Sequence, residues 1–316
     1  MKYDVEADFN LLKTCNFRCS YCFIPLKELG SKLTRHGSSE QWEEGFNATG
    51  KTWMIHVTGG EPFIYPGFVD LCDRLARRHY LSINSNLAHR SVAEFTDKID
   101  PGRVHYINAS LHFEERQKRA MVDEFIDRAK ALLRAQFNVL VSVVMSAEMI
   151  DAFPSLAQQF GAHGLCLLPK VLRGHYRGKH YPEAYSLDQK ARIRGHLLEA
   201  RQKYAEILAR MGEAPTIDMF ADDRFLDGVG RYRGKWCGSG HNFVNISPNG
   251  DVLRCGSGER LGNILQRTVR LLTAPRRCDT EYCPYFCEKY TSAAFVGKVE
   301  ERWAPLPIYV GAALRP

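Results

Sequence analysis

Short apolar runs alternate with amphipathic segments through the first two thirds of the chain. The runs are rich in β-branched residues and bounded by turn residues, which is typical of buried strands. They predict strands at Asp8–Leu12, Trp53–Thr58, Tyr80–Asn84, Val104–Ser110, Asn138–Met145 and Leu165–Leu168. Apolar residues at spacings of three and four predict helices at Ser39–Asn47, Gly67–His79, Ser91–Lys98, Glu114–Gln136, Met149–Phe160 and Leu187–Met211. Ser38 and Gln41 have the spacing of a capping box at the start of the first helix.

Strands that alternate with helices predict an α/β fold with a parallel sheet. Six such units are fewer than the eight of a closed barrel, so we expect an open, partial (β/α)6 TIM-like barrel over residues 1–214. From residue 215 glycines become frequent, and Ser247–Gly250 is a turn signal next to a predicted strand at Asn242–Ser247. Residues 215–316 have few large apolar side chains, which favours a small second domain organised by a metal cluster.

Composition narrows the class of protein. The chain has 316 residues, 45% of them hydrophobic, and a formal net charge of +7. It has no apolar run long enough to cross a membrane and no N-terminal export signal, so we expect a cytoplasmic globular protein. No dense Lys/Arg run suggests a nucleic-acid partner, whereas the mild positive charge permits an anionic substrate.

Eight of the ten cysteines fall into two groups, one near each end of the chain. Cys15, Cys19 and Cys22 form a C-x3-C-x2-C motif without a fourth ligand at short spacing. Clustered cysteines in a reducing compartment indicate metal or redox chemistry, and structural zinc requires four ligands. Three thiolates suit a 4Fe–4S cluster with one iron left open for a substrate or cofactor.

A second motif, Thr58-Gly59-Gly60-Glu61-Pro62, ends the second predicted strand. Its glycines allow the backbone to approach a ligand closely, and Glu61 offers an acceptor to an ammonium group. The carboxyl ends of barrel strands are where such folds place their active sites. Taken alone, the motif is equally compatible with an ordinary turn.

The cysteine motif and the GGEP motif, in this order and separation, resemble the radical S-adenosylmethionine (SAM) superfamily over roughly residues 6–210. The resemblance implies that the three thiolates hold a 4Fe–4S cluster whose open iron is chelated by SAM, and that reductive cleavage yields a 5′-deoxyadenosyl radical. It also implies an electron donor of the flavodoxin or ferredoxin type. The residues implied to bind SAM are Tyr21, Gly59, Gly60, Glu61 and Pro62 and, by position alone, Asn84, Ser85, Asn86, Ser110 and Ser142.

The second cysteine group resembles the SPASM/twitch auxiliary domain of many radical SAM enzymes. Cys237 and Cys255 form a C-x12-G-x4-C pattern, and Cys278, Cys283 and Cys287 follow it. A full SPASM domain has seven cysteines, so the five here suggest one auxiliary 4Fe–4S cluster held by Cys237, Cys255 and two of the last three. A zinc site satisfies the same count and stays an alternative.

Two further features lie near the sixth predicted strand. Cys166 is a candidate catalytic hydrogen-atom donor if it points into the barrel, and otherwise a buried thiol. The segment Lys170–Tyr181 is basic, and its Lys170, Arg173 and Arg177 are candidate ligands for a phosphate or carboxylate group of the substrate. The same segment is equally compatible with a solvated loop.

Three functions remain open at this point. Only fourteen residues precede Cys15, which leaves no room for the leader-binding domain of many peptide-modifying relatives. With the basic segment, this favours oxidation or epimerisation of a small polar molecule, sugar-like or phosphorylated. The alternatives are a ribosomal-peptide maturase, which forms crosslinks or inverts α-carbons, and an iron–sulfur electron-transfer protein.

Overall fold

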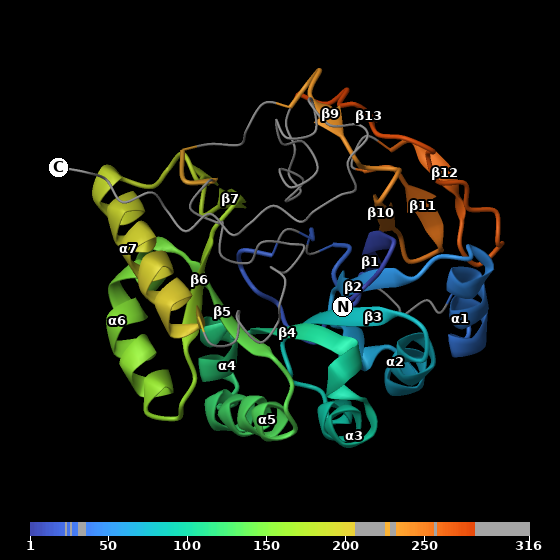
Figure 1. The fold of residues 1–316 in the computed structure, drawn as a ribbon. Coiled ribbons are helices and arrows are strands. Elements are labelled where there is room, and N and C mark those ends of the chain that lie inside the picture. The colour runs from blue at the N-terminus through green and yellow to red at the C-terminus, as the bar shows by residue number, and fades with distance from the viewer. Residues whose placement is uncertain are drawn as a thin grey trace.

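The computed structural model describes residues 1–22, 24–25, 27–30, 36–205, 225–227, 232–255 and 258–281. Its centre is a curved sheet of nine strands in the order β12-β11-β10-β1-β2-β3-β4-β5-β6 (Figure 1). The first six strands along the chain pair in parallel and are β1 Val5–Leu12, β2 Trp53–Gly59, β3 Tyr80–Ser85, β4 Val104–Ser110, β5 Val139–Met145 and β6 Leu167–Val171. The partial barrel expected from the sequence is therefore confirmed.

Seven α-helices of the described chain connect these strands and cover the outer face of the sheet (Figure 1). They are α1 Ser39–Ala48, α2 Phe68–Ala76, α3 Ser91–Lys98, α4 Phe113–Lys118, α5 Val122–Arg134, α6 Ala147–Gly161 and α7 Leu187–Lys203. Two 3-10 turns, η1 Pro62–Ile64 and η2 Pro101–Arg103, precede α2 and β4. The capping box of Ser38 and Gln41 is present at α1. None of the helices described is long and apolar enough to cross a bilayer.

The prediction of one continuous helix over residues 114–136 was wrong, because the structure has two helices there. The break lies between α4 and α5, where Ala120 adopts a φ of 52°. That left-handed conformation cannot continue a right-handed helix. The break leaves α4 as a separate short helix directly after β4, and α4 contacts the first cysteine motif.

The two faces of the sheet differ in chemistry. In β1 the odd-numbered residues are apolar and buried, and Phe9 packs its ring 4.7 Å from that of Trp42 in α1. Because successive side chains of a strand point to opposite faces, Glu6, Asp8 and Asn10 lie on the concave face. β2 and β3 repeat this alternation. In β1 to β3 the outer face therefore forms the hydrophobic core with the helices, and the concave face is mostly polar, with Met54 as an apolar exception.

Strands from the C-terminal segment complete the sheet. β10 Phe243–Ile246 pairs in parallel with β1, and β11 Asp251–Leu253 and β12 Arg260–Asn263 follow in antiparallel order. The turn predicted at Ser247–Gly250 is confirmed by a hydrogen bond of 2.8 Å from Gly250 N–H to the Ser247 carbonyl. Two small ribbons, β7 Gly174–Tyr176 with β8 Lys179–Tyr181 and β9 Trp236–Cys237 with β13 Arg276–Arg277, lie outside this sheet.

The C-terminal strands are packed tightly against α1. A Cβ added at Gly45 of α1 would lie 2.4 Å from the backbone oxygen of Ile264. A glycine inside a helix normally costs roughly 0.5–1 kcal/mol relative to alanine. Here the glycine is required for the close approach of α1 to the residue that follows β12.

We therefore predict opposite effects for the same substitution at two helical sites. Gly45→Ala should lower the melting temperature, because a backbone oxygen cannot move away from the added methyl group as a side chain can. Gly195→Ala in α7, where nothing lies within 4 Å of the added Cβ, should stabilise the protein by up to about 1 kcal/mol. Thermal unfolding of both variants measures this. A stabilised Gly45→Ala would mean that α1 and the C-terminal strands are not in contact.

Candidate radical SAM site

The loop after β1 that carries Cys15, Cys19 and Cys22 is hydrogen-bonded to the end of β2. Gly60 N–H donates to the Leu12 carbonyl at 2.8 Å, and Glu61 N–H donates to the Thr14 carbonyl at 2.9 Å. A Cβ at Gly60 would lie 2.0 Å from the Thr14 oxygen. Gly60 is therefore needed for the two backbones to approach, and GGEP fixes the start of the cysteine loop.

The other side of the cysteine loop is held by α4 and the residues around it. Glu115 accepts a hydrogen bond from Arg18 N–H at 3.2 Å, and Arg119 donates to the Asn16 carbonyl at 2.9 Å. Below them Arg116 has no exposed surface; it stacks over the Phe125 ring at 4.2 Å and over the Phe17 ring at 5.2 Å. A buried guanidinium with such contacts makes α4 a rigid support for the loop.

The three thiols lie in one partly buried group. Burial raises the pKa of Cys15 to about 11 and that of Cys19 to about 12, and the neighbouring thiols contribute to both shifts. The residues that the structure describes contain no set of three His, Cys, Asp or Glu side chains placed around a single metal ion. Thiolates of a cubane cluster each bind a different iron, so they need not converge on one point. This donor set therefore fits a 4Fe–4S cluster, and bound iron would favour the thiolate form.

The Glu61 carboxylate forms hydrogen bonds within the protein. Its side chain has no exposed surface, and its two oxygens accept hydrogen bonds from Phe63 N–H at 3.1 Å, Ser85 Oγ at 2.7 Å and Asn86 N–H at 2.6 Å. Burial raises the pKa of this carboxyl to about 7 in spite of these donors. Glu61 thus joins η1 to the end of β3. Its predicted contact with the ammonium group of SAM would have to compete with these three bonds.

The comparisons with known proteins bear on this arrangement of motifs. A model of the radical SAM superfamily matches residues 9–159, the part that includes the cysteine loop and GGEP. Residues 9–159 therefore match the radical SAM superfamily. The PqqA peptide cyclase of Xanthomonas oryzae is 22% identical over 282 residues, which cover 82% of this chain and 71% of that relative.

Solved structures of radical SAM enzymes have the same fold. SuiB of Streptococcus suis bound to its precursor peptide SuiA has a TM-score of 0.54 at 14% identity, over 96% of this chain and 68% of SuiB. The chain spans 64% of the length of SuiB bound to SAM. The enzyme anSMEcpe with bound SAM has a TM-score of 0.56 at 15% identity, over 84% of this chain and 78% of anSMEcpe.

Tyr21 lies in the cysteine loop, and the other predicted SAM-binding residues lie on β2 to β5 or directly after these strands. Tyr21 is hydrogen-bonded at 3.0 Å to Nδ1 of His112, a residue that the sequence analysis missed. Asn84 is exposed and accepts a hydrogen bond from Ser110 Oγ at 3.0 Å. Ser142 is the register neighbour of Ser110. Ser85 and Asn86 instead contact Glu61, so they position the motif. The roles of all these residues toward SAM stay predictions.

Three of the five C-terminal cysteines are described. Cys237 lies on β9 opposite Arg276 of β13, and Cys278 directly follows β13. Burial raises the pKa of Cys237. Arg254, the residue before Cys255, is 4% exposed. It donates hydrogen bonds to the carbonyl oxygens of Ser239, near Cys237, and of Arg277, next to Cys278. Cys283 and Cys287 lie outside the described residues. The auxiliary site and the domain boundary at residue 214 stay predictions.

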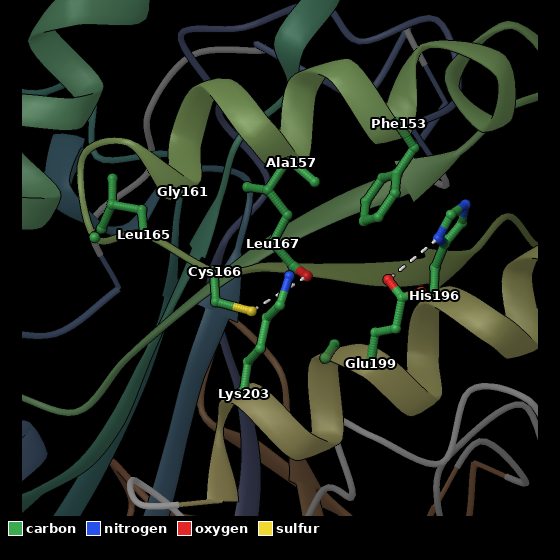
Figure 2. A pocket seen from close by; sticks show the side chains of 11 residues that line it. Phe153, Ala157, Gly161, Leu165, Cys166, Leu167, His196, Glu199 and Lys203 are labelled. Atoms are coloured by element: carbon green, nitrogen blue, oxygen red, sulfur yellow. Dashed lines mark hydrogen bonds and ion pairs between the residues drawn. The ribbon is translucent and has the colours of Figure 1, made fainter.

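Cys166 does not lie in the barrel interior. It precedes β6 and lines a groove of about 280 Å³ on the outer side, between α6 and α7, together with Phe153, His196 and Lys203 (Figure 2). Burial raises the pKa of its thiol to about 11. The expectation that Cys166 points into the barrel is therefore corrected, and this placement does not support a role as hydrogen-atom donor.

The basic segment after β6 forms a hairpin of β7 and β8, which Arg173 precedes. Arg177 lies at the hairpin turn with a φ of 48° and pairs with Glu148. Arg173 stacks over the Phe225 ring at 4.5 Å. Lys170 on β6 lies beside Val144 of β5. Arg177 is thus already paired, and binding of a substrate anion by these residues stays a prediction.

We predict that Glu61→Ala mainly destabilises the protein. The substitution leaves three buried donors without an acceptor, so the free energy of unfolding should fall by about 3 kcal/mol or more. Glu94→Ala on the exposed face of α3 is the matched control and should have little effect. Thermal unfolding and SAM affinity are measured together. Weaker SAM binding with an unchanged melting temperature would instead assign Glu61 to the cofactor.

Proposed function

We propose that this protein is a radical SAM enzyme that modifies a peptide. The observation that carries the proposal is the sequence match to the PqqA peptide cyclase over 82% of the chain. The fold likeness to SuiB, whose structure holds a precursor peptide, agrees with it. These relatives favour the peptide maturase over the small polar molecule that the sequence analysis preferred.

Cys15, Cys19 and Cys22 would hold the 4Fe–4S cluster at the carboxyl ends of the barrel strands. Gly59 and Gly60 would line the SAM site with backbone, and the absence of their side chains lets this backbone approach Leu12 and Thr14. When bound, the cluster and SAM supply a 5′-deoxyadenosyl radical that abstracts a hydrogen atom from the substrate. The contribution of the chain is to hold the loop rigidly through α4 and GGEP, and to exclude water from the concave face.

The C-terminal segment, residues 215–316, would carry the auxiliary cluster. Cys237, Cys255 and Cys278 are candidate ligands, together with Cys283 or Cys287. Arg254 lies between the strands of the described cysteines and offsets part of the negative charge of thiolate ligands. A flavodoxin- or ferredoxin-type donor would reduce the first cluster.

We predict about eight irons per chain after anaerobic reconstitution, from two four-iron clusters. Replacing Cys15, Cys19 and Cys22 together by alanine should leave about four irons and abolish the release of 5′-deoxyadenosine from SAM. Iron analysis and product chromatography with dithionite measure both. About four irons in the unmodified protein, with zinc making up the rest, would contradict the auxiliary cluster. Absence of 5′-deoxyadenosine in the reconstituted protein would favour an electron carrier.

The peptide assignment is tested with the product of a short open reading frame beside the gene. Incubation with the reconstituted enzyme, SAM and dithionite should remove two hydrogen atoms from the peptide or invert a residue at constant mass. Mass spectrometry and chiral amino-acid analysis detect these changes. An unmodified peptide, together with turnover of a sugar or aminocyclitol, would contradict the peptide assignment and favour a small-molecule substrate.

A further inference from the structure

The concave face of β1 and β2 contains a cluster of acidic and other polar residues that is not part of the site described above. Asp8 of β1 has His56 of β2 as its register neighbour on one side and Asn245 of β10 on the other. Glu6 lies one pleat below Asp8, and Ser82 of β3 lies beside His56. None of these five residues is a predicted ligand of the cluster or of SAM. Along β1 and β2 the members of the cluster precede Asn10 and Thr58, the residues of these strands that lie next to the cysteine loop and to GGEP.

Within the described chain, the Asp8 carboxylate lacks a hydrogen-bond donor. Burial raises its pKa to about 6, and the opposing influence comes from the imidazole of His56. The carboxyl group is therefore mostly ionised at neutral pH, and its side chain is half-buried. A carboxylate in such surroundings is costly unless a donor or a cation satisfies it.

Other polar atoms on this face are also left unsatisfied. His56 is 3% exposed; its Nδ1 is hydrogen-bonded to Ser82 Oγ, and its Nε2 has no hydrogen-bond partner in the described chain. This Nε2 lies 3.7 Å from the Glu6 carboxylate, which is too far for a hydrogen bond. The amide nitrogen of Asn245 is likewise buried without a partner. The cluster therefore contains polar atoms that form no hydrogen bond within the described chain.

A cluster of carboxylates and an imidazole suggests a metal ion first, but the geometry does not support one. No three of these side chains, or of any others that the structure describes, converge as metal ligands do. A protonated amine has less demanding geometry. It brings a positive charge to Asp8 and several N–H donors for carboxylate and imidazole acceptors, and charge-assisted bonds of this kind are the strong ones.

We propose that Asp8, with His56 beside it, is a substrate-selecting site that binds a protonated amine in the barrel interior. The site lies below the place where the radical would form, so an amine bound there would position a neighbouring carbon of the substrate. Asn245 adds a donor for an oxygen close to that amine. The inference rests on the proposed function for its substrate, since a lysine side chain is the amine that a peptide supplies.

The test measures binding to the reconstituted full-length protein with SAM and without reductant. The probes are acetyl-Gly-Lys-Gly-amide and its norleucine analogue, which lacks only the charged amine, in saturation-transfer NMR titrations. The lysine peptide should bind about tenfold tighter or more. Asp8→Asn should reduce its affinity to that of the norleucine peptide. Asp97→Asn, the same change at an exposed position on α3, should leave the difference intact.

Equal affinities for the two peptides, together with equal affinities for glucosamine and glucose, would overturn the proposal, as would a lysine preference that survives Asp8→Asn. Glucosamine and glucose serve as a second pair of probes. Discrimination in that pair alone would keep the amine site and assign it to a small molecule. If Asp8→Asn does not fold, carbodiimide coupling of the lysine peptide to the unmodified protein replaces it. Coupling at Asp8 in the peptide map supports the site, and coupling at Asp97 but not at Asp8 overturns it.

SAM cleavage is measured separately on the same preparations with dithionite. Cleavage without discrimination between the probes means that the amine site fails and the proposed function stands. Discrimination between the probes without SAM cleavage means that the amine site stands and the proposed function fails.

Discussion

The site depends on one close backbone contact, the contact of Gly60 with Thr14. It brings the end of β2 against the residue before Cys15, and a side chain at position 60 would prevent it. Two backbone hydrogen bonds then fix the cysteine loop to GGEP. The cysteine loop buries Phe17 against Arg116 and leaves Cys15 and Cys22 partly exposed. Its geometry comes from the strand end and from α4.

The buried charges around this contact form a second level of support. Glu61 and Arg116 are both without exposed surface and lie on opposite sides of Asn86, which donates to the Glu61 carboxylate through its N–H and accepts from the Arg116 guanidinium through its carbonyl. Breaking a buried network of this type by removing one member costs more than the network contributes as a whole. The network therefore gives the end of β3 one defined position beside the cysteine loop.

Much of this architecture could be predicted from the sequence, because it depends on local patterns. Five of the six barrel strands end within one residue of their predicted ends, and both motifs lie where βα units place active sites. The break at Ala120 was missed, since a left-handed residue other than glycine has no clear sequence signal. The orientation of Cys166 stayed open in the sequence, because a short apolar strand does not reveal which face is inward. The acidic group had a signal that was not used: Glu6, Asp8 and Asn10 alternate with apolar residues in a strand that a parallel barrel should bury.

The pairing of β10 with β1 connects the C-terminal segment to the first strand of the sheet. Asn245 comes from the segment that carries the C-terminal cysteines, yet its register partner is Asp8, near the start of the chain. Any movement of the C-terminal segment would be transmitted to the concave face through four paired positions. Because strand pairing is cooperative and rigid compared with a loop contact, the C-terminal segment acts as a wall of the barrel interior. The pairing thus places Asn245 of the C-terminal segment and Asp8 of the first strand side by side on the concave face.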